Sequence, residues 1–188
     1  MEKELIDHLN ENGKYSQDDF KLLETELLQL SLKEGEIILK EKEVCSSIYF
    51  LIKGAAIQFY NDDTHNAVIV DLNGPGDWLL NHKSFATRKP SEYIIKVYSD
   101  SEVYQLSIES IHGLIAKSQS FFQMGKILEE STSRVEFFDH NYTPDQKYHF
   151  LMERRPHLIQ LFPQKVIASY LKITPETLSR VRNRFSKT

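Results

Sequence analysis

A series of short segments rich in β-branched and aromatic residues is the feature that most restricts how this chain can fold. The segments are EIILK, SIYFLIK, AAIQFY, AVIVDL, EYIIKVY and EVYQLS, and they lie between residues 34 and 107. Turn-forming stretches separate them, namely KEGE, NDDTHN, NGPGD, RKPS and SDSE. Short strands spaced in this way predict an antiparallel sandwich or barrel, and not a parallel sheet with crossover helices.

Helical periodicity lies on both sides of this β-rich region. Apolar residues recur at three- and four-residue steps through the first thirty residues, at Leu5, Ile6, Leu9, Phe20, Leu23, Leu27 and Leu30. Helical spacing returns after Ile108 and continues to the end of the chain. The chain is therefore predicted to be α+β, with its strands grouped in the middle of the sequence.

Composition narrows the class of protein. Forty per cent of the residues are apolar and 27% are charged, as in ordinary globular proteins. The single cysteine, Cys45, excludes an internal disulfide framework, and the seven histidines show no metal-ligand spacing, so no cofactor or metal is expected. The N-terminus resembles no signal peptide and no apolar run reaches about 18 residues, which predicts a cytoplasmic protein with no membrane association.

The net charge of −4 conceals an uneven distribution. Residues 142–188 carry nine basic and three acidic side chains, a net charge of +6, whereas residues 1–141 carry 14 basic and 24 acidic side chains. A basic tail on an acidic body indicates a polyanion-binding C-terminal domain, with an uneven but merely solvated surface as the alternative.

A heptad pattern precedes the basic tail. Apolar or small residues step by four and three residues at Met124, Leu128, Ser131, Val135, Phe138 and Tyr142. This spacing is typical of the seam between two helices and predicts a homodimer helix at residues 116–142. The alternative is an amphipathic helix that packs on its own domain. Pro144 ends the pattern, because proline cannot continue a helical hydrogen-bond ladder.

Near the C-terminus, ITPETLSRVRNRF has the chemistry of a short capped helix. Thr174 is a good N-cap, and Pro175 is suited to the first helical position. Helical spacing places Leu178 and Val181 inward and the polar residues outward. Together with the preceding VIASYL, the segment has the spacing of a helix–turn–helix, with Lys172 in the turn.

These residues resemble the Crp/Fnr superfamily of bacterial transcription regulators. VIASYLKITPETLSRVRNRF resembles the family's helix–turn–helix, while EGEIILKEKEVCSSIYFLIKG and NGPGDW resemble its cyclic-nucleotide-binding β-roll. The resemblance implies a jelly-roll-like sensor with N-terminal helices at residues 1–115, a dimerisation helix at 116–142 and a DNA-binding domain at 143–188. Lys172 replaces the usual glycine of the turn, so any positive φ there is unfavourable, and no full β-hairpin wing is expected.

The resemblance assigns DNA contacts residue by residue. The family's E-x-x-S-R recognition pattern matches Glu176, Ser179 and Arg180, where arginine can pair with guanine and glutamate can accept from cytosine. Contacts with the phosphate backbone are expected from Lys165, Thr174, Thr177, Arg182 and Arg184.

The sensor departs from the family's cyclic-nucleotide pattern. Asp77 follows Gly76 where a glutamate is usual, and Pro90 precedes Ser91 where an arginine should neutralise the cyclic phosphate. The expected effector pocket contains Gly76, Asp77, Ser84, Arg88 and Ser91. Its ligand is predicted to be an unidentified small molecule other than cyclic AMP, or the pocket holds none.

The sequence therefore predicts a homodimeric, sequence-specific transcription regulator that binds double-stranded DNA and is not an enzyme. The resemblance adds RNA polymerase as a further partner. The alternative is a small-molecule-binding β-roll module whose helical tail binds another protein. An enzyme built on a cupin-like barrel is disfavoured, because no His/Glu metal cluster is recognisable.

Overall fold

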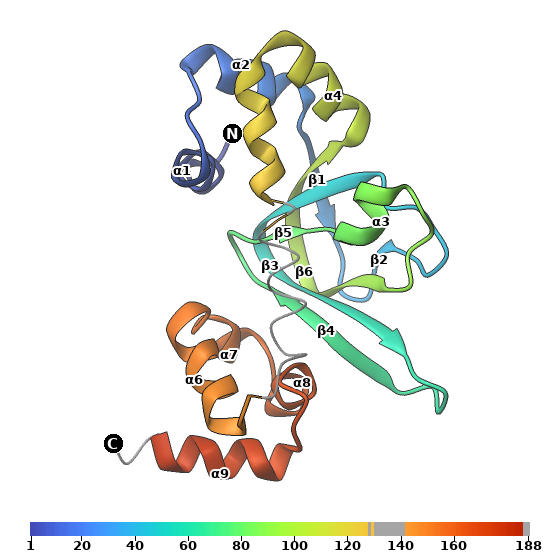
Figure 1. Cartoon of the computed structure of the whole chain (residues 1–188), viewed down its shortest axis with the longest axis vertical. Helices are drawn as coiled ribbons and strands as arrows, with labels where there is room; N and C mark the ends of the chain where they lie inside the picture. The colour runs from blue at the N-terminus through green and yellow to red at the C-terminus, as the bar shows by residue number, and fades with distance from the viewer. Residues whose placement is uncertain (128, 130–141, 186–188) are drawn as a thin grey trace.

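A computed structural model describes residues 1–127, 129 and 142–185 of the chain. Its sheet occupies the middle of the molecule, with the N-terminal helices at one end and the C-terminal helices at the other (Figure 1). The helices at the N-terminal end are α1 (Lys3–Asn12), α2 (Gln17–Glu26), α4 (Ile108–Lys117) and the 3₁₀ helix η1 (Gln119–Met124). Those at the C-terminal end are α6 (Pro144–Arg154), α7 (Leu158–Leu161), α8 (Gln164–Tyr170) and α9 (Pro175–Phe185).

Six strands form one antiparallel sheet in the part of the chain that the structure describes. They are β1 (Leu28–Leu32), β2 (Ile37–Leu39), β3 (Ser47–Asn61), β4 (Ala67–Asn73), β5 (Trp78–Leu79) and β6 (Ile94–Ser107). The order is β1-β6-β3-β4, with β2 also paired to β6 and β5 to β3, while the short helix α3 (His82–Thr87) follows β5. The predicted α+β fold with an antiparallel β-roll is confirmed.

Two local predictions are wrong. Leu27 and Leu30 do not continue a helix, because α2 ends at Glu26 and Leu30 pairs with Val103 in the sheet. The alternation of LQLSL is that of a strand, but Leu23, Leu27 and Leu30 also match a helical spacing. The segment SDSE is not a turn, since it lies inside β6 and joins two predicted strands into one.

The long strands β3 and β6 bend together at Gly54. The register between them shifts on both sides of this residue, and Gly54 has a φ of 97°. A Cβ atom at this position would lie 2.5 Å from the carbonyl oxygen of Asp100. Glycine is therefore required here for both its conformation and its lack of a side chain.

One hydrophobic core joins the N-terminal helices to the sheet. Phe50 and Trp78 meet edge to face with their ring centroids 5.2 Å apart, and Leu5 and Leu9 of α1 are buried in the same cluster. Met124 also belongs to this cluster and is buried. The end of η1 is thereby held against the N-terminal helices.

A second core is shared between the sheet and the C-terminal helices. Ile57, Phe59, Ile69 and Leu72 of β3 and β4 belong to one buried cluster with apolar residues of the C-terminal helices, among them Tyr148, Leu151, Leu158, Ile167, Leu171, Leu178 and Val181. The amide of Ile69 also donates a 3.4 Å hydrogen bond to Ser169 Oγ of α8. The helix–turn–helix is thus packed directly on the sheet.

Replacement of Gly54 by alanine should destabilise the fold by about 3–4 kcal/mol, because backbone strain at positive φ adds to overlap with the Asp100 carbonyl. Gly35 is the matched control, since its φ is 87° but no atom lies within 4 Å of the place that a Cβ would take. Gly35→Ala should cost about 1–2 kcal/mol from strain alone. Urea denaturation of both variants measures the difference, and equal losses would show that the close approach is unimportant.

Candidate nucleic-acid interface and effector cavity

Helices α8 and α9 form a helix–turn–helix with a tight turn. Leu171 is the C-cap of α8, and Lys172 follows in the left-handed conformation with a φ of 54°. The Lys172 amide donates to Ser169 O at 3.0 Å, and the Ile173 amide donates to Ala168 O at 3.0 Å. The predicted unfavourable positive φ at Lys172 is confirmed, and these two hydrogen bonds help to hold it.

The start and the inner face of α9 agree with the sequence prediction. Thr174 caps the helix through a 3.2 Å hydrogen bond from the Thr177 amide to Thr174 Oγ1, and Pro175 is the first helical residue. Leu178 and Val181 are buried in the second core. Two anchored side chains on successive turns fix which face of α9 is turned to solvent.

The proposed base-reading residues lie together on the outer face of α9, where Glu176, Ser179 and Arg180 are exposed. Arg180 makes long hydrogen bonds of 3.4 Å, from Nε to Glu176 O and from Nη2 to Thr177 Oγ1. The pKa of Glu176 is lowered by its own backbone N–H, by the Thr174 hydroxyl and by the charge of Arg180. An ionised acceptor and a cationic donor therefore lie side by side on this face.

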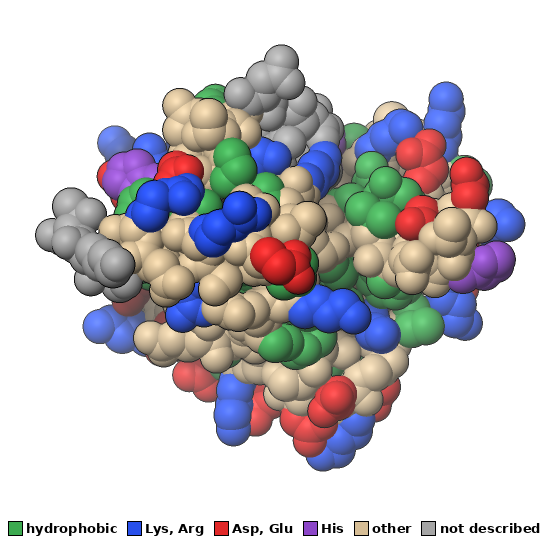
Figure 2. Space-filling view, turned by 90° about the horizontal axis from the view of Figure 1, so that it is seen from below, with side chains coloured by type: hydrophobic (Ala, Val, Ile, Leu, Met, Phe, Trp, Pro, Cys, Tyr) green, Lys and Arg blue, Asp and Glu red, His purple; other side chains and the backbone are tan. Residues whose placement is uncertain are grey.

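The proposed phosphate-binding residues are all at least partly exposed, but they are not equally available. Lys165 and Thr174 are exposed, while Thr177 and Arg182 are half-buried. Arg184 is exposed and forms a bidentate ion pair with Asp145 of α6, with Nη2–Oδ2 at 2.6 Å and Nε–Oδ1 at 3.0 Å. Figure 2 looks onto the α9 end of the molecule, where several Lys and Arg side chains are spread over the surface.

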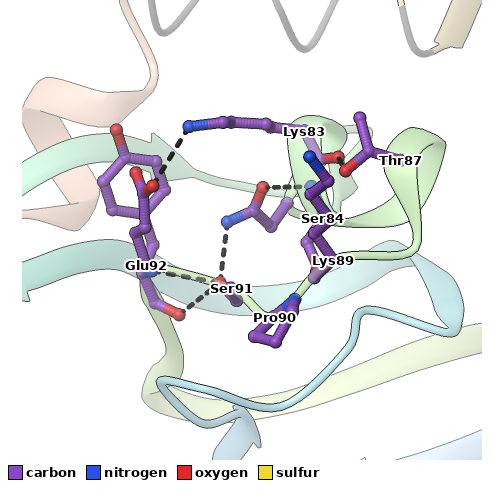
Figure 3. A pocket seen from close by; sticks show the side chains of 9 residues that line it. Lys83, Ser84, Thr87, Lys89, Pro90, Ser91 and Glu92 are labelled. Atoms are coloured by element: carbon purple, nitrogen blue, oxygen red, sulfur yellow. Dashed lines mark hydrogen bonds and ion pairs between the residues drawn. The ribbon is translucent and has the colours of Figure 1, made fainter.

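A cavity of about 370 Å³ lies between α3 and the start of β6 (Figure 3). It is lined by Asn81, Lys83, Ser84, Thr87, Lys89, Pro90, Ser91, Glu92 and Tyr93. Of the predicted effector residues, Ser84 and Ser91 are brought together here, whereas Gly76, Asp77 and Arg88 are not part of the lining.

Polar groups around this cavity bond mainly to one another. Asn81 Nδ2 donates to Ser91 Oγ at 2.7 Å, and Asn81 Oδ1 accepts from the Ser84 amide at 3.0 Å. Ser84 Oγ donates to Lys89 O at 2.6 Å, and Lys83 reaches Glu92 with a 3.1 Å ion pair. Figure 3 shows the ion pair between Lys83 and Glu92 across the pocket. An entering anion would have to compete with Glu92 for Lys83.

The remaining predicted effector residues have other partners. Gly76 donates its amide to Leu51 O at 2.8 Å, and Arg88 Nη1 donates to Cys45 O at 2.8 Å. Asp77 Oδ2 accepts from the Gly74 amide at 2.8 Å and from Arg155 Nη2 at 2.6 Å. The Gly76–Asp77 turn is therefore bonded to the C-terminal helices and to the neighbouring strand β3.

Sequence reasoning did not identify Arg155. This side chain is 7% exposed, at the C-terminal end of α6, and also bonds to Asp71 Oδ1 at 3.2 Å and to Leu72 O at 2.6 Å. Burial disfavours its charge, but Asp77 and Asp71 outweigh this and raise the pKa of Arg155. The available signal was Asp71, an acidic residue inside the apolar segment AVIVDL that needs a buried partner.

The predicted dimerisation seam falls mostly outside the described residues, which do not include Leu128, Ser131, Val135 and Phe138. Met124 is described and is buried against the N-terminal helices of its own chain. The seam therefore stays a prediction.

Within residues 1–127, 129 and 142–185, no group of three or more His, Cys, Asp or Glu side chains gathers in a way that could hold a metal ion. None of the helices described combines the length and apolarity needed to cross a membrane.

Comparisons with known proteins show a likeness that centres on the sheet. Residues 29–118 match the family model of the cyclic nucleotide-binding domain. No curated protein sequence matches the chain. Matches among solved structures do extend to the C-terminal helices.

Three such structures illustrate the likeness. FixK2 from Bradyrhizobium japonicum is 17% identical with a TM-score of 0.71, and the match covers 86% of this chain and 85% of that one. Thermus thermophilus Catabolite Activator Protein is 14% identical with a TM-score of 0.55, covering 92% and 84%. A protein described as a transcriptional regulator of the Crp/Fnr family, from Eubacterium rectale, is 17% identical with a TM-score of 0.60, covering 92% and 84%. Residues 29–118 are thus similar to the cyclic nucleotide-binding domain, and the chain shares its overall fold with these three proteins.

Proposed function

We propose that this chain is a homodimeric, sequence-specific DNA-binding transcription regulator of the Crp/Fnr type, which acts in the cytoplasm and is not an enzyme. The observation that carries the proposal is the geometry of α9. Leu178 and Val181 anchor the helix in a core shared with the sheet, while Glu176 and Arg180 are presented together on its exposed face. A short, rigidly mounted helix with such a face is suited to the major groove.

Base reading is assigned to the outer face of α9. Arg180 can donate two hydrogen bonds to O6 and N7 of a guanine, and the Glu176 carboxylate can accept from N4 of a cytosine. Ser179 lies between them and is small enough to let the helix approach the base edges. The hydrogen bonds that Arg180 makes within its own helix are long, so they are readily exchanged for bonds to a base.

Phosphate contacts are assigned to residues around this face. Lys165 at the start of α8, Thr174 and Thr177 at the start of α9, and Arg182 are placed to fix the register of the protein on the duplex. Arg184 contributes less strongly than its position suggests, because Asp145 already holds its guanidinium in a bidentate pair. Its contact with a phosphate requires this pair to open or to be shared.

Two copies of the chain are needed for a full operator. In helix–turn–helix dimers the recognition helices enter successive major grooves about 34 Å apart. We assign the pairing of the two copies to the helix predicted at residues 116–142. RNA polymerase is a further partner under this proposal.

Selection of bound sequences from a random duplex library tests the proposal and defines the half-site. On the selected duplex, Arg180→Ala should cost about 1–3 kcal/mol of binding free energy and remove the preference at one guanine. Lys165→Ala removes the same charge and should instead weaken binding to all sequences alike, lowering the salt slope by about one. Fluorescence polarisation over a salt series measures both quantities.

The two variants would contradict the assigned roles if they changed specificity and salt slope in the same way. If the wild-type protein selects no sequence and binds duplex DNA negligibly at low salt, the proposal fails as a whole. That result would favour a small-molecule-binding module whose helical tail contacts another protein.

We further propose that neither cyclic AMP nor cyclic GMP controls this protein. Pro90 stands where the family has the arginine that neutralises the cyclic phosphate. It pairs with Val44 in an isolated β-bridge. Asp77, which stands where the family usually has a glutamate, is held by Arg155, and Arg88 is held by the Cys45 carbonyl. Lys83 and Lys89 line the cavity but are exposed, and Lys83 is paired with Glu92, so neither replaces a buried arginine. Burying a cyclic phosphate without such a cation costs several kcal/mol, which neutral hydrogen bonds of about 1 kcal/mol each do not offset.

Calorimetric titration with cyclic AMP and cyclic GMP should therefore show no binding in the micromolar range. The affinity for the selected duplex should likewise be unchanged when either nucleotide is added. A low-micromolar dissociation constant for either nucleotide would overturn this part of the proposal and leave DNA reading itself intact.

A further inference from the structure

The contact between the sheet and the C-terminal helices consists of an apolar area with one buried charge cluster inside it. The apolar part joins residues of β3 and β4 to the four C-terminal helices. The charged part joins Arg155 to Asp71 and Asp77, of which Arg155 and Asp71 are buried and Asp77 is 15% exposed. The two parts contribute different kinds of interaction.

Arg155 contacts both sides of this interface. On the sheet side, its guanidinium bonds to Asp71 of β4, to the Leu72 carbonyl and to Asp77 in the turn before β5. On the helical side, Nη1 lies 3.4 Å from Tyr170 Oη of α8. One rigid, planar group thus links the end of α6, the helix–turn–helix and two points of the sensor sheet.

The backbone around Arg155 limits how this group can move. Its amide donates to Leu151 O at 2.9 Å and ends α6, and Pro156 follows directly. On the other side, Asp71 lies in a paired strand opposite Gln58, and Asp77 closes a turn by accepting from the Gly74 amide. The ring Nε2 of His157 is 3.9 Å from the same Asp77 oxygen, too far for a hydrogen bond. The donors and acceptors are therefore fixed on both sides.

Directional and non-directional forces act differently at such an interface. Apolar contacts favour burial of area but tolerate sliding and rotation of the two surfaces. A guanidinium bonded to two carboxylates and a carbonyl allows only one relative placement, because any rotation leaves a buried charge without its partner. The net stability from a buried ion cluster is small, so we expect this cluster to act here through the arrangement it selects and not through the stability it adds.

We propose that Arg155, with Asp71 and Asp77, is the positioning element that fixes the orientation of the helix–turn–helix on the sensor sheet, and that it thereby sets the half-site spacing that the dimer reads. The first part stands on the interface alone, and the second rests on the proposed function. Under this proposal Asp77 is a positioning residue and not a contact to an effector.

The orientation is tested by double electron–electron resonance on the full chain. Spin labels are attached at Glu109→Cys in α4 and Gln160→Cys in α7, both exposed positions on opposite sides of the interface. Cys45 can remain, because it is buried and burial raises the pKa of its thiol, which keeps it unreactive. Labelled protein is diluted into unlabelled protein so that distances within one chain dominate.

Arg155→Met should broaden a narrow distance distribution, because the interface keeps its apolar area and loses its directional bonds. Arg154→Met is the matched control, since it removes the same charge from the exposed neighbouring residue and should leave the distribution narrow. A distribution in Arg155→Met that is as narrow as in the wild type, at the same mean distance, would overturn the proposal.

Arg155→Met leaves two buried carboxylates without their cation, so it can fail to fold for that reason alone. The triple variant Arg155→Met, Asp71→Asn, Asp77→Asn removes the whole charge cluster and avoids this penalty. It should fold, with an unchanged helical circular dichroism signal, and should still show the broad distribution. A folded triple variant with the narrow distribution would also overturn the proposal.

The consequence for DNA is measured on duplexes in which the selected half-sites are moved apart or together by one and two base pairs. The wild type and Arg154→Met should prefer one spacing by about tenfold or more, whereas the triple variant should bind all spacings within about threefold. Equal binding of an isolated half-site by all three proteins would show that base reading is intact. A retained spacing preference in the triple variant would refute the spacing claim. If the wild type binds no DNA, the proposed function fails, and the resonance result still decides the orientation claim.

Discussion

The C-terminal helices depend on the β-sheet for their hydrophobic core. Residues 142–185 are too few to bury a large core by themselves, and domains of this size usually need additional support. Here β3 and β4 supply that support, because Ile57, Phe59, Ile69 and Leu72 pack in one cluster with α6 to α9. The position of α9, and with it every proposed DNA contact, therefore follows from how this face of the sheet is built.

The features that the sequence predicted are those encoded by neighbouring residues. The strands, the Thr174 cap and the buried Leu178 and Val181 all follow from spacing and residue type within one segment. The positive φ at Lys172 was instead suggested by the resemblance, which has glycine at this turn position. Where one pattern fitted two structures the prediction failed, as at Leu27 and Leu30, because LQLSL matches both a strand and the end of a helix. Pairing with β6 decided the outcome there, and such pairing is a long-range effect.

In the candidate sites too, local features could be predicted from the sequence and long-range contacts could not. Exposure of Glu176 and Arg180 could be predicted from helical spacing, but the bond between Arg155 and Asp77 joins residues far apart in sequence. No local pattern in the chain indicates which buried cation accompanies Asp71. The resemblance placed Asp77 in an effector pocket because of its neighbours Gly76 and Trp78, whereas its hydrogen-bond partners come from a different part of the fold.

A short stretch of chain connects the cavity to the C-terminal helices. Only Trp78, Leu79 and Leu80 separate Asp77, which Arg155 holds, from Asn81, which lines the cavity. All three are buried, and Trp78 and Leu79 are paired to Phe50 and Tyr49 of β3. A close-packed segment of this length does not absorb a displacement at one end by deforming in the middle. Under the proposed function, a ligand that displaces Asn81 would therefore act on the same short stretch of chain that ends at the turn held by Arg155.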